Sequence, residues 1–365
     1  MQQVRITTWQ VILLIISMIL PTAILSVPSM VVEHASSDAW VSLLLATAAG
    51  VGGAYISGTI SIKYPRLTIF KIMEKTLGRV PSKVIGFMMT YYFFVSGFGV
   101  LRQFVNFMVD SVMKQTPPLV FGIVAVLLVM YALYYGIEVI ARVNQIILMT
   151  SFFVFLLSTL FYLKEMKFDR LLPILDTPFN RILMGAVAPF SWLSESMVIL
   201  LLAPFLIHPG KARKAAVLGV VLTGLSMAWT IIGSIAIFGE KTLALFAYPT
   251  FNVFRIIEVA GFLERIDALF IAVWVGTMIM KLTVFMFCGF YCFTQTFGIR
   301  EQIPFLFPYG MLTMSLSIVS WRNVAELNLY QLYTATSRLL FINIVIPAIL
   351  LIVVLWKNRK KRVGT

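Results

Sequence analysis

The amino-acid sequence predicts an all-α integral membrane protein with about ten transmembrane helices and almost no soluble domain. Of the 365 residues, 60% are hydrophobic and only 12% are charged, whereas a soluble domain carries roughly 25% charged residues. Apolar runs of roughly 20 residues, each long enough to cross the hydrocarbon core, recur along the whole chain. A transmembrane β-barrel would require short stretches of alternating polarity. The long uninterrupted runs therefore favour a helical bundle.

The apolar runs define the expected spans of a single transmembrane domain, residues 1–365. They cover residues 8–32, 38–62, 84–111, 118–138, 143–163, 181–206, 213–238, 262–297, 303–320 and 332–356. Lys and Arg concentrate on the side that holds the connection 63–83 and the tail Lys357–Arg362, whereas Arg338 is assigned to the opposite side. This bias predicts that both termini are cytoplasmic, which requires an even number of spans.

The formal net charge of +14 does not indicate a nucleic-acid partner. The basic excess lies in short loops and in the C-terminal tail, where membrane topology requires it. We expect the tail to attract anionic lipid headgroups. Cys288 and Cys292 lie four residues apart in an apolar stretch with no histidine nearby, so neither a disulfide framework nor a metal site is expected. The sequence has no nucleophile–base arrangement and no Gly-rich phosphate loop, so we expect no enzymatic activity and no cofactor.

Two prolines interrupt spans at matching places. Pro21 lies in the first span and Pro189 in the sixth. Proline removes a backbone donor and clashes with the preceding turn, so each should kink or break its helix. Because five spans separate the two interruptions, the pattern is that of an inverted five-helix repeat, with residues 1–165 as the first copy and 178–360 as the second.

Broken helices at membrane depth leave peptide groups that lipid cannot satisfy, so such breaks face cavities and can bind ligands. A single proline kink needs no functional explanation, but two kinks at matching positions favour a functional explanation. The residues near the breaks that we expect to contact a ligand are Leu20, Pro21, Thr22, Ala23, Phe190, Ser191 and Ser194.

Three charged residues lie toward the middle of expected spans: Glu195, Arg102 and Lys281. A charge at the bilayer centre costs on the order of 3 kcal/mol, so it normally faces the protein interior and finds a partner. Glu195 is therefore expected to pair with Arg102 or with Lys281, and the sequence does not choose between them. All three are candidate ligand-binding residues, although a buried pair could simply lock helices together. Lys281 could also act as a tethered cation in place of a coupling ion.

Small residues recur at every fourth position of the second span. A stripe of this kind lets a neighbouring helix approach closely. Its members are Ala46, Gly50, Ala54 and Gly58.

Four places in the chain resemble one known family. They are Leu25-Ser26-Val27-Pro28 followed by Asp38-Ala39-Trp40; Thr116-Pro117 downstream of Arg102; the region of Glu195; and Gly261-Phe262-Leu263-Glu264-Arg265-Ile266-Asp267 with Trp274, after Tyr248-Pro249-Thr250. In order and spacing they resemble the spore germination permease family, the B subunits of nutrient germinant receptors in spore-forming Bacillota, over essentially the full length. The family belongs to the amino acid–polyamine–organocation superfamily.

The resemblance implies a LeuT-like fold of two inverted five-helix repeats, with helices 1 and 6 broken around a central substrate site. It implies a place in the spore inner membrane and a complex with an A-type membrane subunit and a C-type lipoprotein. Such a complex senses amino acids or sugars and triggers germination. Glu264, Arg265 and Asp267 are interpreted as a structural or subunit-contact cluster at the outer edge of the eighth span.

Two departures from the family pattern concern the ligand. Members of the family have a Gly-x-Gly stretch at the break in the first span, where this chain has Leu20-Pro21-Thr22-Ala23. Lys281 stands where a neutral residue would be expected. Both departures indicate a different ligand, or a subunit that has lost ligand binding.

The function favoured by the sequence is that of a receptor subunit that senses a small nutrient. The alternative is a secondary active transporter of amino acids. A third interpretation is a structural subunit that passes signals or ions and binds nothing.

Overall fold

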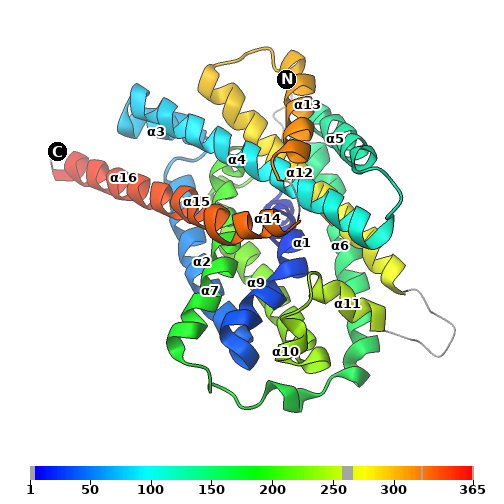
Figure 1. The fold of residues 1–365 in the computed structure, drawn as a ribbon. Helices are drawn as coiled ribbons and strands as arrows, with labels where there is room; N and C mark the ends of the chain where they lie inside the picture. Colours follow the sequence, from blue (N-terminus) through cyan, green and yellow to red (C-terminus); the bar gives the residue numbers. More distant parts are fainter. Residues whose placement is uncertain (1–4, 257–265, 322–323, 364–365) are drawn as a thin grey trace.

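The computed structural model describes residues 5–256, 266–321 and 324–363. The chain forms a bundle of long helices (Figure 1), and the described residues contain one isolated β-bridge, between Ile6 and Leu206. That bridge ties the N-terminal segment to the end of the sixth span, since the Ile6 amide donates to the Phe205 carbonyl over 2.9 Å. The motif 261–267, with Glu264, Arg265 and Asp267, lies outside the residues whose side chains the structure describes.

The long helices follow the expected spans closely. Spans one to five are α1 (Thr8–Ala35), α2 (Ala39–Lys63), α4 (Arg79–Phe107) with the π-helical turn η2 (Met108–Val112), α5 (Pro118–Tyr135) and α6 (Ile137–Tyr162). Spans six to nine are α7 (Phe179–Leu193) continued by η5 (Ser194–Val198), α8 (Ile199–Leu202) and η6 (Ala203–Phe205), then α9 (Ala212–Phe238), α12 (Ile266–Phe297) and α13 (Ile303–Val319). Span ten consists of α14 (Val324–Leu329), η8 (Tyr330–Ala335), α15 (Thr336–Leu340), η9 (Phe341–Val345) and α16 (Ile346–Val363).

Short helices form the turns and connections between the spans. They are η1 (Ser36–Asp38), α3 (Ile69–Leu77), η3 (Leu163–Glu165), η4 (Phe168–Leu171), η7 (Pro209–Lys211), α10 (Glu240–Leu243) and α11 (Pro249–Ile256). The basic helix α3 and the far end of α16 lie toward one end of the bundle, and α10 lies at the other end (Figure 1).

Eight helical stretches of the described chain are long and apolar enough to cross a membrane. The first, Thr8–Lys63, contains both α1 and α2 around the turn η1, and α13 is a shorter apolar helix that is not among the eight. The helices therefore correspond to the ten expected spans. Helices α5 and α6 expose many large apolar side chains, among them Leu127, Tyr131, Phe152 and Phe153. Apolar surface of this kind is favourable in contact with lipid, whereas its exposure to water costs free energy.

The spans pack as two groups. In the first group, α2 packs along α9, and α1 packs against α7 and α9. In the second, α12 packs along α4, and α13 packs against α4 and α5. Helix α6 contacts both α1 and α12 and so lies between the groups. Spans one and six, which carry Pro21 and Pro189, belong to the first group, and both contribute side chains to its boundary with the second.

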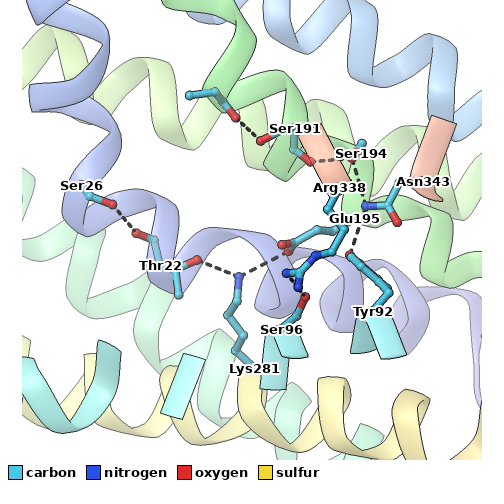
Figure 2. A network of polar contacts seen from close by, with 11 residues as sticks. Thr22, Ser26, Tyr92, Ser96, Ser191, Ser194, Glu195, Lys281, Arg338 and Asn343 are labelled. Carbon is cyan, nitrogen blue, oxygen red and sulfur yellow. Dashed lines mark hydrogen bonds and ion pairs between the residues drawn. The ribbon is translucent and has the colours of Figure 1, made fainter. Parts of the chain in front are cut away.

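The first span bends without breaking. Helix α1 is continuous through Pro21 and Pro28, and its ribbon changes direction near Thr22 and Ser26 (Figure 2). Pro28 cannot donate to the Ile24 carbonyl four residues earlier. The hydroxyl of Thr250 in α11 donates to that carbonyl instead. A long-range side chain thus satisfies a group that the proline leaves free.

The sixth span is interrupted after Leu193, four residues beyond the expected place. Helix α7 contains Pro189 and runs on to Leu193, where the 3₁₀ segment η5 begins. The hydroxyl of Ser191 donates to the Ala188 carbonyl at 2.7 Å, and that of Ser194 donates to the Ser191 carbonyl. Serine hydroxyls that bond to carbonyls of the preceding turn compete with the regular α-helical pattern. The change in helix type therefore follows the serines, and it places Glu195 within the tightened segment.

Asp38 fixes the connection after the fifth span. Its side chain is fully buried, and its two carboxylate oxygens accept from the amides of Leu175 (2.7 Å) and Thr177 (3.0 Å). The Thr177 hydroxyl donates to the Ala35 carbonyl at 3.1 Å. The turn between α1 and α2 is therefore joined to a connection that lies more than a hundred residues away in the chain.

Replacing Asp38 by asparagine is expected to destabilise the protein by about 1–3 kcal/mol, because the amide offers one acceptor oxygen to the two N–H groups that the charged carboxylate binds. The measurement is the melting temperature of the purified protein in detergent. Asp176→Asn changes an exposed aspartate of the same connection and should have almost no effect. An equal loss in both variants would argue against this role for Asp38.

Candidate functional site

A buried polar network lies where the two helix groups meet (Figure 2). The Lys281 ammonium, from α12, donates to the Thr22 hydroxyl of α1 at 2.7 Å. The same nitrogen lies 3.3 Å from Oε2 of Glu195, in η5. Lys281 is 1% exposed and Glu195 5%. The network thus joins the bent first span, the 3₁₀ segment of the sixth and the centre of the eighth.

The structure settles which cation pairs with Glu195. Its partner is Lys281, and Arg102 takes no part in the network. Two buried charges lose their hydration, so they are tolerated when they neutralise each other and their remaining groups are hydrogen-bonded. The ammonium also lies 5.3 Å from the centroid of the Phe285 ring, which gives it a cation–π contact.

A second cation approaches the network from the tenth span. Nη2 of Arg338, in α15, donates to the Ser96 hydroxyl of α4 at 3.3 Å. The guanidinium carbon lies 5.9 Å from the Tyr92 ring centroid and 5.7 Å from that of Tyr330. Arg338 therefore lies against two aromatic rings, and Figure 2 shows its side chain beside Glu195.

Asn343 connects the tenth span to the interrupted sixth span. Its Nδ2 donates to the hydroxyl of Ser194 and to that of Tyr92, each over 3.1 Å. Tyr92 and Asn343 are both fully buried. This bond pattern holds η5, which carries Glu195, against α4 and η9.

A small cavity of about 50 Å³ opens beside the ion pair. Thr22, Glu195, Lys281 and Arg338 line it, together with residues of α4 and η8. This volume holds one or two water molecules or a chemical group of a few heavy atoms. The cavity combines polar side chains of both signs, so it can hold a small polar or charged group.

The ligand candidates around Pro21 face different ways. Thr22 lines the polar cavity. Leu20 and Pro21 line a separate apolar groove of about 370 Å³ between α1, α6, α9 and α12. The Pro21 carbonyl is occupied, because the Trp274 indole nitrogen donates to it over 2.9 Å. Of the four residues from Leu20 to Ala23, Thr22 is the one whose side chain joins the network. The carbonyls of Pro21 and Ile24 accept hydrogen bonds from the side chains of Trp274 and Thr250.

The remaining candidates divide into network and packing residues. Ala23 is fully buried in the apolar core, and Phe190 is half-buried against it. Ser191 bonds to its own helix, whereas Ser194 also accepts from Asn343. Of these four side chains, Ser194 is the one that the structure joins to the network.

Arg102 closes the end of another helix. Its Nη2 donates to the Trp321 carbonyl at 3.0 Å and its Nη1 to the Ile318 carbonyl at 3.4 Å. These carbonyls lie at or just beyond the C-terminus of α13, where backbone acceptors lack helical partners and attract cations. Arg102 does not line the polar cavity. Its placement indicates a capping role and corrects the expectation that it contacts Glu195 or a ligand there.

The sequence analysis missed Arg338, Tyr92, Ser96 and Asn343. Arg338 counts there as a flanking charge of the last span, but the structure places it inside that span, facing the cavity. Gln331 and Arg338 are seven residues apart in an apolar stretch, and this spacing puts both on one helix face. That spacing was the available signal. Within the described ranges, no group of three or more His, Cys, Asp or Glu side chains could hold a metal ion.

The fold is shared with a protein of known structure. The crystal structure of MhsT in complex with L-phenylalanine superposes on the chain with a TM-score of 0.66 at 14% sequence identity, covering 97% of this chain and 99% of that one. The molecule is therefore an all-α integral membrane protein with the LeuT-like architecture that the family resemblance implies.

The sequence comparisons then identify the family. Residues 5–325 match the spore permease family, described as spore germination protein. Spore germination protein YndE of Bacillus subtilis (strain 168) is 24% identical over 364 residues, covering 98% of each chain. Spore germination protein KB of the same organism is 23% identical over 371 residues, covering 99% of this chain and 97% of that protein. The chain belongs to the spore germination permease family, whose permease-like members are germinant-receptor B subunits.

Proposed function

We propose that the chain senses a small nutrient, an amino acid or a sugar, at the polar cavity and thereby triggers spore germination. The observation that carries this proposal is the Glu195–Lys281 pair, which bridges the two helix groups beside a cavity. The proposed location is the spore inner membrane, with both termini cytoplasmic. The proposed partners are an A-type membrane subunit and a C-type lipoprotein, and we propose no enzymatic activity.

The packing of the spans supports the proposed repeats, residues 1–165 and 178–360. Spans one and two pack with spans six and seven, and spans three and four pack with spans eight and nine. Elements five spans apart thus occupy the same group, as expected where two related halves are intertwined. Under this division, Thr22 comes from the first copy, whereas Glu195 and Lys281 come from the second.

The geometry suggests how a ligand could produce a signal. A ligand shifts an equilibrium between two states only if it binds one of them better. A polar group that enters the cavity competes for the hydrogen bonds between Lys281, Glu195 and Thr22. Because these residues lie on both helix groups, a new set of bonds favours a different arrangement of the groups, which partner subunits can detect.

Glu195→Asp tests this proposal in spores. The variant keeps the negative charge, so the subunit should accumulate normally, but the shorter side chain moves the carboxylate away from Lys281. We expect germination in response to single amino acids or sugars to need at least about ten-fold more nutrient, the change that a loss of about 1.4 kcal/mol in binding would produce. The readout is the fall in optical density of the spore suspension, with subunit abundance measured by immunoblot.

Glu138→Asp is the matched control, since Glu138 forms an ion pair with Arg142 that is exposed on the surface of the helix. Its dose–response should equal that of the wild type. An unchanged dose–response for Glu195→Asp, at normal abundance, would refute a sensing role for the pair.

A second candidate function is secondary active transport of amino acids. The fold favours it, because MhsT has the same architecture, and Lys281 supplies a fixed cation where a coupling ion could otherwise act. Labelled amino acids offered to the purified protein in liposomes, under a proton or sodium gradient, separate the two functions. Uptake that depends on the gradient would favour transport, and binding without uptake would favour sensing.

A further inference from the structure

The tenth span has an unusual backbone around Arg338. Helix α15 is only five residues long and lies between two π-helical segments, η8 and η9. π-Helical turns are rare in proteins and occur frequently at functional sites. Here η9 carries Asn343, which lies five residues beyond Arg338 and would stand on a different face of a regular helix. Gln331, Ala335, Arg338 and Leu339 line the polar cavity, while Asn343 reaches Tyr92 and Ser194.

Arg338 forms no direct ion pair with a carboxylate among the described residues. The ion pairs there are Glu195–Lys281 and the exposed Glu138–Arg142. Nη2 of Arg338 bonds to a neutral hydroxyl, and its Nε is buried without a hydrogen-bond partner in that part of the chain. An unneutralised cation at membrane depth is costly. The Nε of Arg102 is likewise buried without a described partner, but both Nη atoms of Arg102 donate to carbonyls at the end of α13.

The charges around the cavity do not balance. Lys281 and Glu195 neutralise each other, so Arg338 leaves one positive charge at the cavity wall. The guanidinium is a planar fork of donors that matches a carboxylate, and it lies against the rings of Tyr92 and Tyr330. The volume of about 50 Å³ suits one group of that size.

We propose that Arg338 binds the carboxylate of the ligand and that the cavity therefore selects small molecules that carry a carboxylate. This inference rests on the proposed function, because it requires that a ligand enters the cavity. Lys281 is already engaged by Glu195 and Thr22, so Arg338 is the cation that can accept a new anion. A neutral sugar or a carboxamide leaves the charge of Arg338 unmatched and binds less well.

The test compares each acid with its own amide. The purified chain in detergent is heated with acetate or acetamide, glycine or glycinamide, L-alanine or L-alaninamide, and L-phenylalanine or its amide, with glucose as a neutral sugar and ionic strength held constant. We expect at least one acid to raise the melting temperature clearly more than its amide and more than glucose. The same acid should lose at least ten-fold in apparent affinity in Arg338→Gln.

Arg338→Lys and Arg142→Gln complete the design. Lysine keeps the positive charge but lacks the planar pair of donors of the guanidinium. The affinity of Arg338→Lys for the acid should therefore lie between those of the wild type and Arg338→Gln. Arg142 is exposed on α6, and its variant should match the wild type. The comparison of acid with amide needs only the wild type, so it stands even if Arg338→Gln fails to fold.

The outcomes separate this inference from the proposed function. If an amide or glucose stabilises the wild type as well as any acid does, a ligand binds but the carboxylate selectivity is wrong. If an acid stabilises Arg338→Gln as well as the wild type, Arg338 is not its receptor. If no compound stabilises the wild type, the proposed ligand site itself is refuted, and this inference with it.

Discussion

Replacing Glu195 by glutamine is expected to lower the free energy of unfolding by about 3–5 kcal/mol, the cost of leaving a buried charge without its partner. The variant leaves Lys281 and Arg338 on one cavity with no anion between them. Lys281→Met should cost less, because Glu195 then still shares the cavity with the positive charge of Arg338. The double variant removes both members of the pair, so we expect it to be more stable than Glu195→Gln alone.

The measurement is the melting temperature of the wild type, the two single variants and the double variant in one detergent. The exposed pair Glu138–Arg142 supplies a control cycle, Glu138→Gln with Arg142→Met, and exposed pairs contribute about 0.2–1 kcal/mol. If the double variant, Glu195→Gln with Lys281→Met, lost as much stability as the two single variants together, the two residues would not be coupled in the protein.

The spans could be predicted from the sequence because each is specified locally. A run of about 20 apolar residues is sufficient to cross a bilayer, whatever the rest of the chain does. The stripe of small residues in α2 could likewise be read from the spacing within one helix. The bend at Pro21 was predicted too, since proline removes a donor in any helix. The groups that satisfy the bend, Thr250 and Trp274, lie more than 200 residues away, and no local pattern connects them to α1.

The pairing of Glu195 needed the three-dimensional structure. Sequence showed that its charge requires a partner and named two, but helix packing decides which of Arg102 and Lys281 comes near. The interruption of the sixth span was misplaced for a different reason. The expectation considered the donor lost at Pro189, whereas the helix changes type where serine hydroxyls compete for carbonyls, after Leu193.

Asn343 was missed because its contact with Tyr92, which Arg338 also approaches, depends on an irregular helix. Arg338 and Asn343 are five positions apart, and in a regular α-helix this spacing places side chains on clearly different faces. The π-helical segments η8 and η9 change that register. Hydrophobic periodicity assumes one fixed period, so it cannot detect a span whose function depends on leaving that period.

The close approach of α2 and α9 yields a second large effect. Gly58 lies where a Cβ atom would be 2.5 Å from the Arg213 Cα, so a larger residue would collide with backbone that no change of rotamer can move away. We expect Gly58→Val to destabilise the protein by about 3 kcal/mol, at the upper end of the usual cost of overpacking.

Gly52→Val is the matched control, because Gly52 lies on the same helix and a Cβ atom at this position would meet no other atom within 4 Å. Both variants place the same β-branched side chain in α2, so any difference between their melting temperatures measures the contact with α9 rather than helix propensity. If the two variants lost stability equally, the small-residue stripe would matter for the helix itself and not for its packing. A large loss confined to Gly58→Val would show that this contact holds together the helix group that presents Thr22 and Glu195 to Lys281.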